Sequence, residues 1–156
     1  MTGSLIRPAA EADIPALVAL ELGFPPEDRF PVRTWRRLLR GHALAYVSVS
    51  DEEITGAAVY LYRAGSTVAR LYSLTVSPEH RGKGLAAALL SAGEADARKR
   101  GCDRIRLEVR QSNLTAIRLY ERHGFRVMAL SNSYYPDGET AVRMEKPVPP
   151  DASPAT

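Results

Sequence analysis

In the first part of the chain, the pattern of hydrophobic and polar residues is that of a short strand followed by two helices. Residues 5–7 (Leu-Ile-Arg) predict a short first strand, which Pro8 ends. Residues 10–22 carry apolar side chains at helical spacing among acidic ones, with Pro15 near the start, and predict an amphipathic helix. Residues 32–40 predict a second helix.

The second predicted helix and the segment before it differ in composition from the rest. Residues 24–31 contain three prolines, so no regular structure is predicted there. The helix has an apolar side that includes Trp35. Its opposite side is made of four arginines: Arg33, Arg36, Arg37 and Arg40. Such a basic face is usually only solvated, and substrate binding is the alternative function.

Three strands are predicted in direct succession. Apolar, β-branched stretches at residues 43–49 and 54–62 are separated by a polar turn at 50–53, the pattern of a β-hairpin. A second turn at 63–66 leads into a third strand at 68–76. The three strands together predict an antiparallel meander.

The rest of the chain alternates helices and strands. The predicted elements are a helix at 87–100, a strand at 104–109, a shorter helix at 113–122 stopped by Gly124, and a closing pair of strands at 125–130 and 140–145. This order predicts one α/β domain over residues 1–146, with a mixed, mostly antiparallel sheet flanked by helices. The crossover from residue 68 to 109 should be right-handed and parallel. Residues 147–156, with four prolines, are predicted to be a disordered tail.

Composition narrows the classes of function. The net charge of +3 is spread along the chain and does not favour nucleic-acid binding. No apolar run is long enough to span a membrane, and we expect no signal peptide and a cytoplasmic location. The single Cys102 is predicted to be a small buried residue rather than a nucleophile. No metal site is predicted, and the oligomeric state stays open.

The most informative segment is the loop between strand 68–76 and helix 87–100. It reads Arg81-Gly82-Lys83-Gly84-Leu85-Ala86. A strand that turns through glycines into a helix leaves free N–H groups at the helix N-terminus, which is an arrangement that binds phosphate. An ordinary surface turn is the alternative. Neither a G-x-G-x-x-G run nor a Walker A loop is present, so dinucleotide and P-loop sites are not favoured.

These residues resemble a known family. Arg81-x-x-Gly84-x-Ala86 matches the Q/R-x-x-G-x-G/A signature of the Gcn5-related N-acetyltransferases (GNAT superfamily). The later segments LEVRQSN (107–113), AIRLYE (116–121) and YYP (134–136) resemble the RimI-type protein N-terminal acetyltransferases. The resemblance covers about residues 71–146. The segment from Phe24 to Trp35 is longer and more charged than in the RimI type, so the acceptor stays open.

The resemblance implies an acyl-CoA N-acyltransferase fold and acetyl-coenzyme A as cofactor. It implies that backbone N–H groups of the glycine loop hold the pyrophosphate, and that the pantetheine arm pairs with the backbone of Leu74, Thr75 and Val76. It also assigns Asn113 to coenzyme contact. Glu108 is implied as general base and Tyr120 as general acid. Tyr134 and Tyr135 would lie over the acceptor cleft and clamp the backbone of a protein N-terminus.

Each of these residues also has a purely structural interpretation. Asn113 is a good helix cap, and Tyr120 stands on the apolar side of its helix with the character of a core tyrosine. Glu108 could lie on a solvated strand face, paired with Arg106 or Arg110. Tyr134 and Tyr135 could simply pack across strands.

Three hypotheses of function follow. The first is acetyl transfer to the α-amine of a protein or peptide, with a ribosomal protein as one candidate. This amine has a pKa near 8 against about 10.4 for lysine, so a moderate base such as Glu108 can deprotonate it. The second is a GNAT enzyme acting on a small-molecule amine or a lysine side chain. The third is a non-catalytic acyl-CoA-binding domain, which would need neither Glu108 nor Tyr120.

Overall fold

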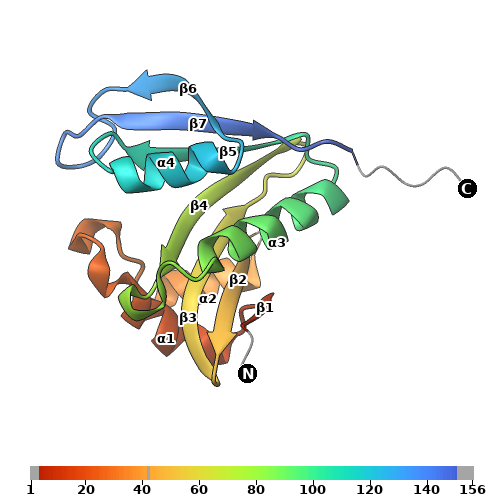
Figure 1. Cartoon of the computed structure of the whole chain (residues 1–156), viewed down its shortest axis with the longest axis vertical. Helices are drawn as coiled ribbons and strands as arrows, with labels where there is room; N and C mark the ends of the chain where they lie inside the picture. The colour runs from red at the N-terminus through yellow and green to blue at the C-terminus, as the bar shows by residue number, and fades with distance from the viewer. Residues whose placement is uncertain (1–3, 42, 151–156) are drawn as a thin grey trace, which may run out of the picture.

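The computed structural model describes residues 4–41 and 43–150, and shows a seven-stranded sheet (Figure 1). The strands are β1 (Leu5–Pro8), β2 (Ala43–Ser50), β3 (Glu53–Leu61), β4 (Val68–Val76), β5 (Arg104–Arg110), β6 (Arg126–Ser131) and β7 (Ala141–Pro147). Their spatial order is β1-β2-β3-β4-β5-β7-β6. Neighbours are antiparallel except β4 and β5, which are parallel. The predicted mixed, mostly antiparallel sheet is therefore confirmed.

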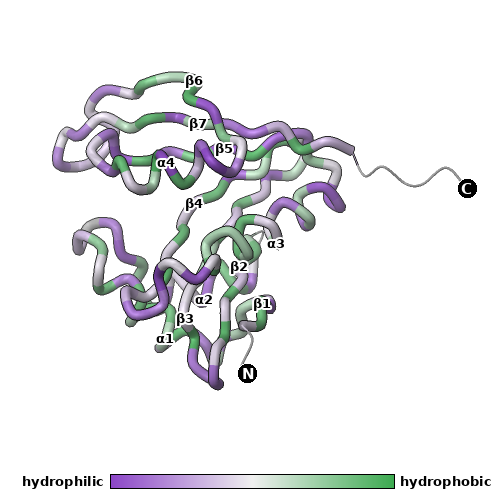
Figure 2. Tube along the Cα trace, viewed as in Figure 1, coloured by the Kyte–Doolittle hydropathy of each residue, from purple (hydrophilic) through white to green (hydrophobic). Residues whose placement is uncertain are grey.

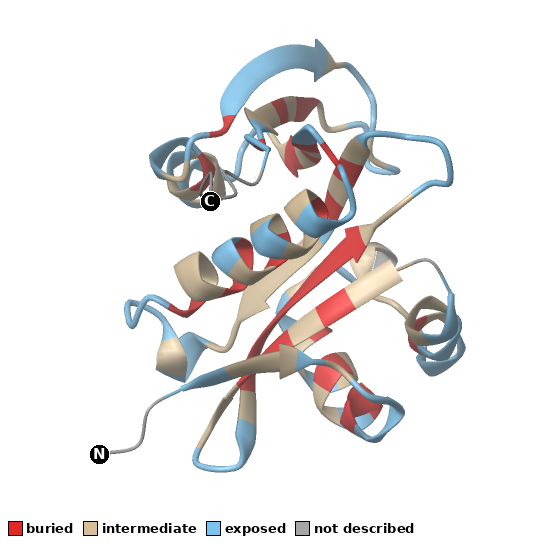
Figure 3. Ribbon diagram, turned by 90° about the vertical axis from the view of Figure 1, so that its right-hand side faces the viewer, coloured by how far each residue is buried: buried red, intermediate tan, exposed pale blue. Residues whose placement is uncertain are grey.

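Helices cover both faces of the sheet. They are α1 (Ile14–Leu20), α2 (Val32–Arg40), α3 (Leu85–Lys99) and α4 (Leu114–Arg122). Helices α3 and α4 pack on one face and α1 and α2 on the other, so two apolar cores form (Figure 1). Strand β3 serves both, because Ala58 and Tyr60 belong to one core and Ala57 and Val59 to the other. Figure 3 shows the buried residues gathered along the central strands and the inner sides of the helices.

The predicted hairpin of β2 and β3 is present. Ser50 pairs with Glu53, and the two residues between them, Asp51 and Glu52, have φ of 51° and 65°. Positive φ at both central positions is what a two-residue hairpin turn needs to match the twist of its strands. The turn stands out as hydrophilic in Figure 2.

Strands β4 and β5 pair over only a short stretch. Their register runs from Val68 opposite Arg104 to Arg70 opposite Arg106. Beyond these pairs β4 continues to Val76, and Figure 1 shows it slanting away from β5. A β-bulge in β4 at Tyr72, opposite the Val59/Tyr60 step of β3, accompanies the divergence. The predicted parallel crossover is thus confirmed, and the sheet splits beyond it.

Helix α3 lies close on β3 because it carries a glycine where the two elements touch. A Cβ at Gly93 would stand 2.0 Å from Cζ of Tyr60, a side chain that is fully buried. We therefore expect Gly93→Ala to lower the free energy of unfolding by about 1–3 kcal/mol, because overpacking outweighs the better helix propensity of alanine. Urea denaturation measures this change. Gly23→Ala is the control, since nothing lies within 4 Å of its Cβ; equal stability of the two variants would contradict the packing argument.

Two predicted boundaries in the first forty residues need correction. The α-helical part of residues 10–22 is only α1, with 3₁₀ turns at Glu11–Asp13 and Glu21–Gly23 on either side. The sequence predicts no regular structure for residues 24–31, yet Pro26–Asp28 form a further 3₁₀ turn. Proline at the start of a turn is compatible with this geometry because its missing N–H would have no partner there.

The C-terminal prediction is wrong for its first residues. Pro147 ends β7, and Val148 is 3% exposed with its N–H donating to the carbonyl of Asp103 at 2.8 Å. A single apolar residue therefore anchors the segment. Residues 151–156 of the predicted tail lie outside the described residues. Cys102 is buried as predicted, and among the residues described we find no helix with the length and apolar character to cross a membrane.

Candidate active site

The glycine loop has the predicted geometry. Gly82 and Gly84 have φ of 80° and 79°, and α3 begins directly after Gly84. The N–H groups of residues 82–87 donate no backbone hydrogen bond within the described part of the chain. Arg81 folds back, and its Nε donates to the carbonyl of Val76 at 3.2 Å. Free N–H groups at the positive end of a helix dipole fit a pyrophosphate group.

Next to this loop, one edge of β4 has no strand partner among the described residues. Leu74, Thr75 and Val76 pair with β3 on one side, while the register with β5 ends at Arg70. The side chains of Leu74 and Val76 pack against the core under α3. An unpaired strand edge can accept an extended ligand through its backbone groups.

Glu108 projects from β5 on the face opposite Leu107 and Val109, as the alternation predicts. Its side chain is only 6% exposed and lies between two arginines. Nη2 of Arg70 on β4 lies 2.8 Å from Oε1, and Nε of Arg143 on β7 donates to Oε2 at 3.2 Å. The proposed structural alternative, a solvated face paired with Arg106 or Arg110, is therefore wrong in both its partners and its exposure.

The pairing leaves part of the Glu108 carboxylate without a directed donor. Oε1 is buried and accepts no well-aligned hydrogen bond from the described residues, despite the close contact with Arg70. The Nε of Arg70 is buried without a partner among those residues as well. Buried polar atoms normally have partners; Oε1 keeps its ion pair with Arg70, whereas the Nε of Arg70 has no partner among the described residues.

Tyr120 lies on the other side of the sheet from Glu108. It is buried, with its ring edge-on to Phe125 at 5.6 Å between centroids. Burial raises the pKa of the phenol above its usual value. Tyr120 is thus a core residue of the α4 face, and its catalytic role stays a prediction.

Asn113 is the N-cap of α4. Its Oδ1 accepts a hydrogen bond from the N–H of Ala116 at 3.1 Å. The capping interpretation is confirmed. The side chain is exposed, so contact with a coenzyme also stays a prediction.

Tyr134 and Tyr135 lie in the loop between β6 and β7 rather than in a cross-strand pair. Their rings meet edge-on at 5.0 Å. The Tyr134 hydroxyl accepts from Nη2 of Arg70 at 2.8 Å, which connects this loop to Glu108 through one arginine. Burial raises the pKa of Tyr135 to about 12.

Arg110 joins two loops on the Glu108 face of the sheet, and the sequence did not single it out for this. Its guanidinium contacts Asp28 at 3.0 Å, Asp137 at 2.8 Å and Glu139 at 3.1 Å, and it stacks on the Tyr135 ring at 4.2 Å. Asp28 belongs to the segment between α1 and α2, and the other three residues to the β6–β7 loop. Arg110 therefore ties together the two segments that flank the split.

A second buried carboxylate, which the sequence analysis did not identify, binds the segment between α1 and α2 through a hydrogen bond. Glu21 is 2% exposed, and its Oε1 accepts the N–H of Phe30 at 2.7 Å. Desolvation raises the pKa of Glu21. Phe30 in turn stacks on Tyr72 at the β4 bulge and meets the ring of Trp35 edge-on. The segment is thus packed over β4 beside the split.

A cavity of about 700 Å³ opens on the same face, between α2, the β3–β4 turn and Tyr134. Glu108 is one of its lining residues. The lining also includes five arginines: Arg37, Arg63, Arg70, Arg106 and Arg143. Its size is typical of a ligand site. Among the described residues no group of three or more metal-ligating side chains is found.

Comparisons with known proteins agree with this architecture. Residues 14–125 match the family described as Acetyltransferase (GNAT) family. A streptothricin acetyltransferase from Streptomyces lavendulae is 34% identical over 104 residues, 64% of this chain and 55% of that protein. An N-alpha-acetyltransferase from Saccharolobus solfataricus is 31% identical over 155 residues, with 92% of both proteins covered.

A solved structure extends the similarity to nearly the whole chain. The ribosomal-protein-S18-alanine N-acetyltransferase from Escherichia coli aligns with a TM-score of 0.82 and 28% identity, covering 99% of both chains. At the level of sequence, the chain spans about half the length of several curated relatives that it matches, the streptothricin enzyme among them. The match to the family covers well over half of this chain. The protein belongs to the acetyltransferase (GNAT) family.

Proposed function

We propose that the protein is an acetyl-CoA-dependent N-acetyltransferase whose acceptor is the α-amine of a protein or peptide. Similarity to an N-alpha-acetyltransferase over 92% of both chains supports this class of acceptor. The observation that carries the proposal is Glu108, a buried carboxylate beside the split in the sheet, fixed between Arg70 and Arg143.

The chain offers complementary groups for the coenzyme. The N–H groups of residues 82–87 would hold its pyrophosphate, and the free edge of Leu74–Val76 would pair with its pantetheine arm. Bound there, the coenzyme supplies an acetyl thioester. Backbone N–H groups near Val76 would polarise the acyl carbonyl and favour attack by an amine.

Glu108 would accept the proton of the acceptor amine. Its two carboxylate oxygens lie against Arg70 and Arg143, so the carboxylate is fixed in orientation. An α-amine with a pKa near 8 is neutral in about a tenth of molecules at pH 7, against far fewer than a thousandth for lysine. A weak base can therefore complete deprotonation of the α-amine more easily.

Tyr120 would stabilise the leaving thiolate by a hydrogen bond rather than by giving up its proton. An ordinary phenol already transfers a proton to a thiolate uphill by about 2 kcal/mol. Burial raises the pKa of Tyr120 further, so the phenol stays protonated through neutral and mildly alkaline pH. It remains a hydrogen-bond donor across that range.

The proposal is tested with three acceptors and release of free thiol as the readout. They are a lysine-free peptide with a free N-terminus, an N-terminally blocked peptide with one lysine, and streptothricin, the substrate class in the name of one relative. Only the free N-terminus should be acetylated efficiently. Its kcat/KM should rise with pH and level off near 8, because the α-amine loses its proton there. Faster acetylation of the blocked peptide or of streptothricin would refute the assignment.

A further inference from the structure

The cavity beside Glu108 has an unbalanced charge. Five arginines contribute to its lining, and Glu108 is the only carboxylate among the described residues that line it. Arg70 and Arg143 share that one carboxylate. Arg106 pairs with Glu145, which also contacts Arg104. The wall of the cavity therefore carries a strong excess of positive charge.

Two of the arginines have no counter-charge of their own. Arg37, at the C-terminal part of α2, and Arg63, in the β3–β4 turn, are exposed and make no ion pair with any residue in the described ranges. They come from separate elements and lie on the same concave surface. Like charges repel one another, and a concave wall concentrates their field, so the arrangement favours an anionic occupant over water alone.

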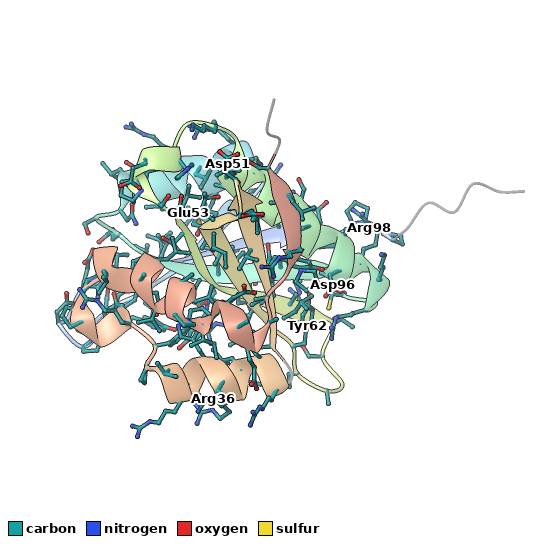
Figure 4. The ribbon with its side chains drawn as sticks, turned by 90° about the horizontal axis from the view of Figure 1, so that it is seen from below. Arg36, Asp51, Glu53, Tyr62, Asp96 and Arg98 are labelled. Atoms are coloured by element: carbon teal, nitrogen blue, oxygen red, sulfur yellow. The ribbon has the colours of Figure 1, made fainter. Side chains whose placement is uncertain are left out.

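Further arginines lie outside the cavity, on α2. Arg33, Arg36 and Arg40 line a shallower hollow on α2 that shares Arg37 and Gly41 with the cavity. Figure 4 shows Arg36 on the outer side of α2, pointing away from the sheet. Arg40 is paired with Glu11. This outer row is a solvated face, and it adds positive potential around the mouth of the cavity without lining it.

The strand geometry gives the distance between the base and the first arginine. Glu108 and Arg106 are two residues apart on β5 and point to the same face, about 7 Å apart along the strand. An extended peptide advances about 3.3–3.6 Å per residue. With its α-amine at Glu108, a peptide running along the cavity would bring its second and third residues to Arg106 and later ones to Arg37 and Arg63.

We infer that the acceptor is a peptide N-terminus with acidic side chains at its second to fourth residues, which this arginine-lined cavity receives. The inference rests on the proposed function and adds the chemistry of the acceptor. An acidic first residue gains nothing, because it would lie beside the Glu108 carboxylate. A stretch of arginine or lysine following the first residue is disfavoured by the same charges.

The test uses peptides with a free N-terminal serine that differ only at their second and third residues, which are both aspartate, both asparagine or both lysine. The expected order of kcat/KM is aspartate, asparagine, lysine, with roughly tenfold between the first two at low salt. The ratio should shrink as salt rises, because the cavity is open to solvent. A fourth peptide has aspartate at position 1 and asparagine at positions 2 and 3. Its kcat/KM should not exceed that of the peptide with serine at position 1 and the same two asparagines.

Arg37→Gln/Arg63→Gln is the test variant, since neither arginine holds an ion pair within the described part of the chain. It should reduce the aspartate-to-asparagine ratio to about threefold or less. Lys99→Gln/Arg126→Gln removes the same charge from exposed positions outside the cavity and should leave the ratio unchanged. Equal rates for all peptides, or an equal loss of the aspartate-to-asparagine ratio in both double variants, would overturn this inference and leave the proposed function standing. If no free peptide is acetylated, the proposed function falls with it.

Discussion

Replacing Glu108 with glutamine is expected to lower kcat about 10²-fold while leaving the affinity for acetyl-CoA nearly unchanged. The substitution removes the proton acceptor and keeps the volume of the side chain. The segments proposed to hold the coenzyme, the glycine loop and the free edge of β4, belong to other elements. Turnover is measured across pH 6–9 with a peptide that has a free N-terminus, and the affinity for acetyl-CoA is measured by calorimetry.

Glu108 also holds two arginines, so a matched control must separate chemistry from charge balance. Glu145→Gln serves this purpose, because Glu145 lies on β7, is similarly shielded and is also shared by two arginines, Arg104 and Arg106. It should lower stability by a comparable amount and kcat far less. If Glu108→Gln and Glu145→Gln lose activity equally, or if neither loses any, Glu108 is not the base.

Gly84→Asp is expected to abolish the stabilisation by acetyl-CoA. At about 100 times Kd a ligand adds roughly 2.7 kcal/mol, which for a protein of this size raises Tm by about 5–10 °C. The new carboxylate would stand at the N-terminus of α3, where it repels a pyrophosphate and competes for the free N–H groups. Thermal unfolding with and without acetyl-CoA measures the loss.

Gly65→Asp controls for the strain of the substitution itself. Gly65 and Gly84 both have φ of 79°, and at either position a Cβ would have no heavy atom of the described residues within 4 Å beyond its chain neighbours. Without coenzyme both variants should be destabilised by the unfavourable φ, and Gly84→Asp less so, because its carboxylate caps the free N–H groups of α3. Only Gly84→Asp should lose the rise in Tm. A full rise in that variant would place the coenzyme elsewhere.

Local rules of sequence were enough to predict most of the elements. The two-residue turn between β2 and β3, the proline at the start of α1 and the Asn113 cap each depend on residues within a few positions of one another. The burial of Val148 was not predicted, because a single valine among prolines forms no periodic pattern. Val148 is buried in the core under α3 and α4, and its N–H bonds to Asp103, far away in the chain.

The sequence allowed single residues of the candidate site to be predicted, but not the contacts between them. Alternation on β5 indicated which face Glu108 takes, but its partners, Arg70 and Arg143, lie 38 and 35 positions away on other strands. Their pairing depends on the register of β5 with β7 and on where β4 leaves β5, which no local pattern encodes. The same holds for Arg110, whose acidic partners come from two separate loops.

The two cores on opposite faces of the sheet have a consequence for how substitutions combine in this protein. The buried residues of the core beneath α1 and α2 all come from residues 14–59, and those of the other core from residues 58–148. Substitutions in separate, non-contacting clusters tend to be additive in their effect on stability. Changes in stability caused by substitutions under α1 and α2 are therefore expected to add to those caused by substitutions under α3 and α4. The exception is β3, whose alternate residues belong to the two cores.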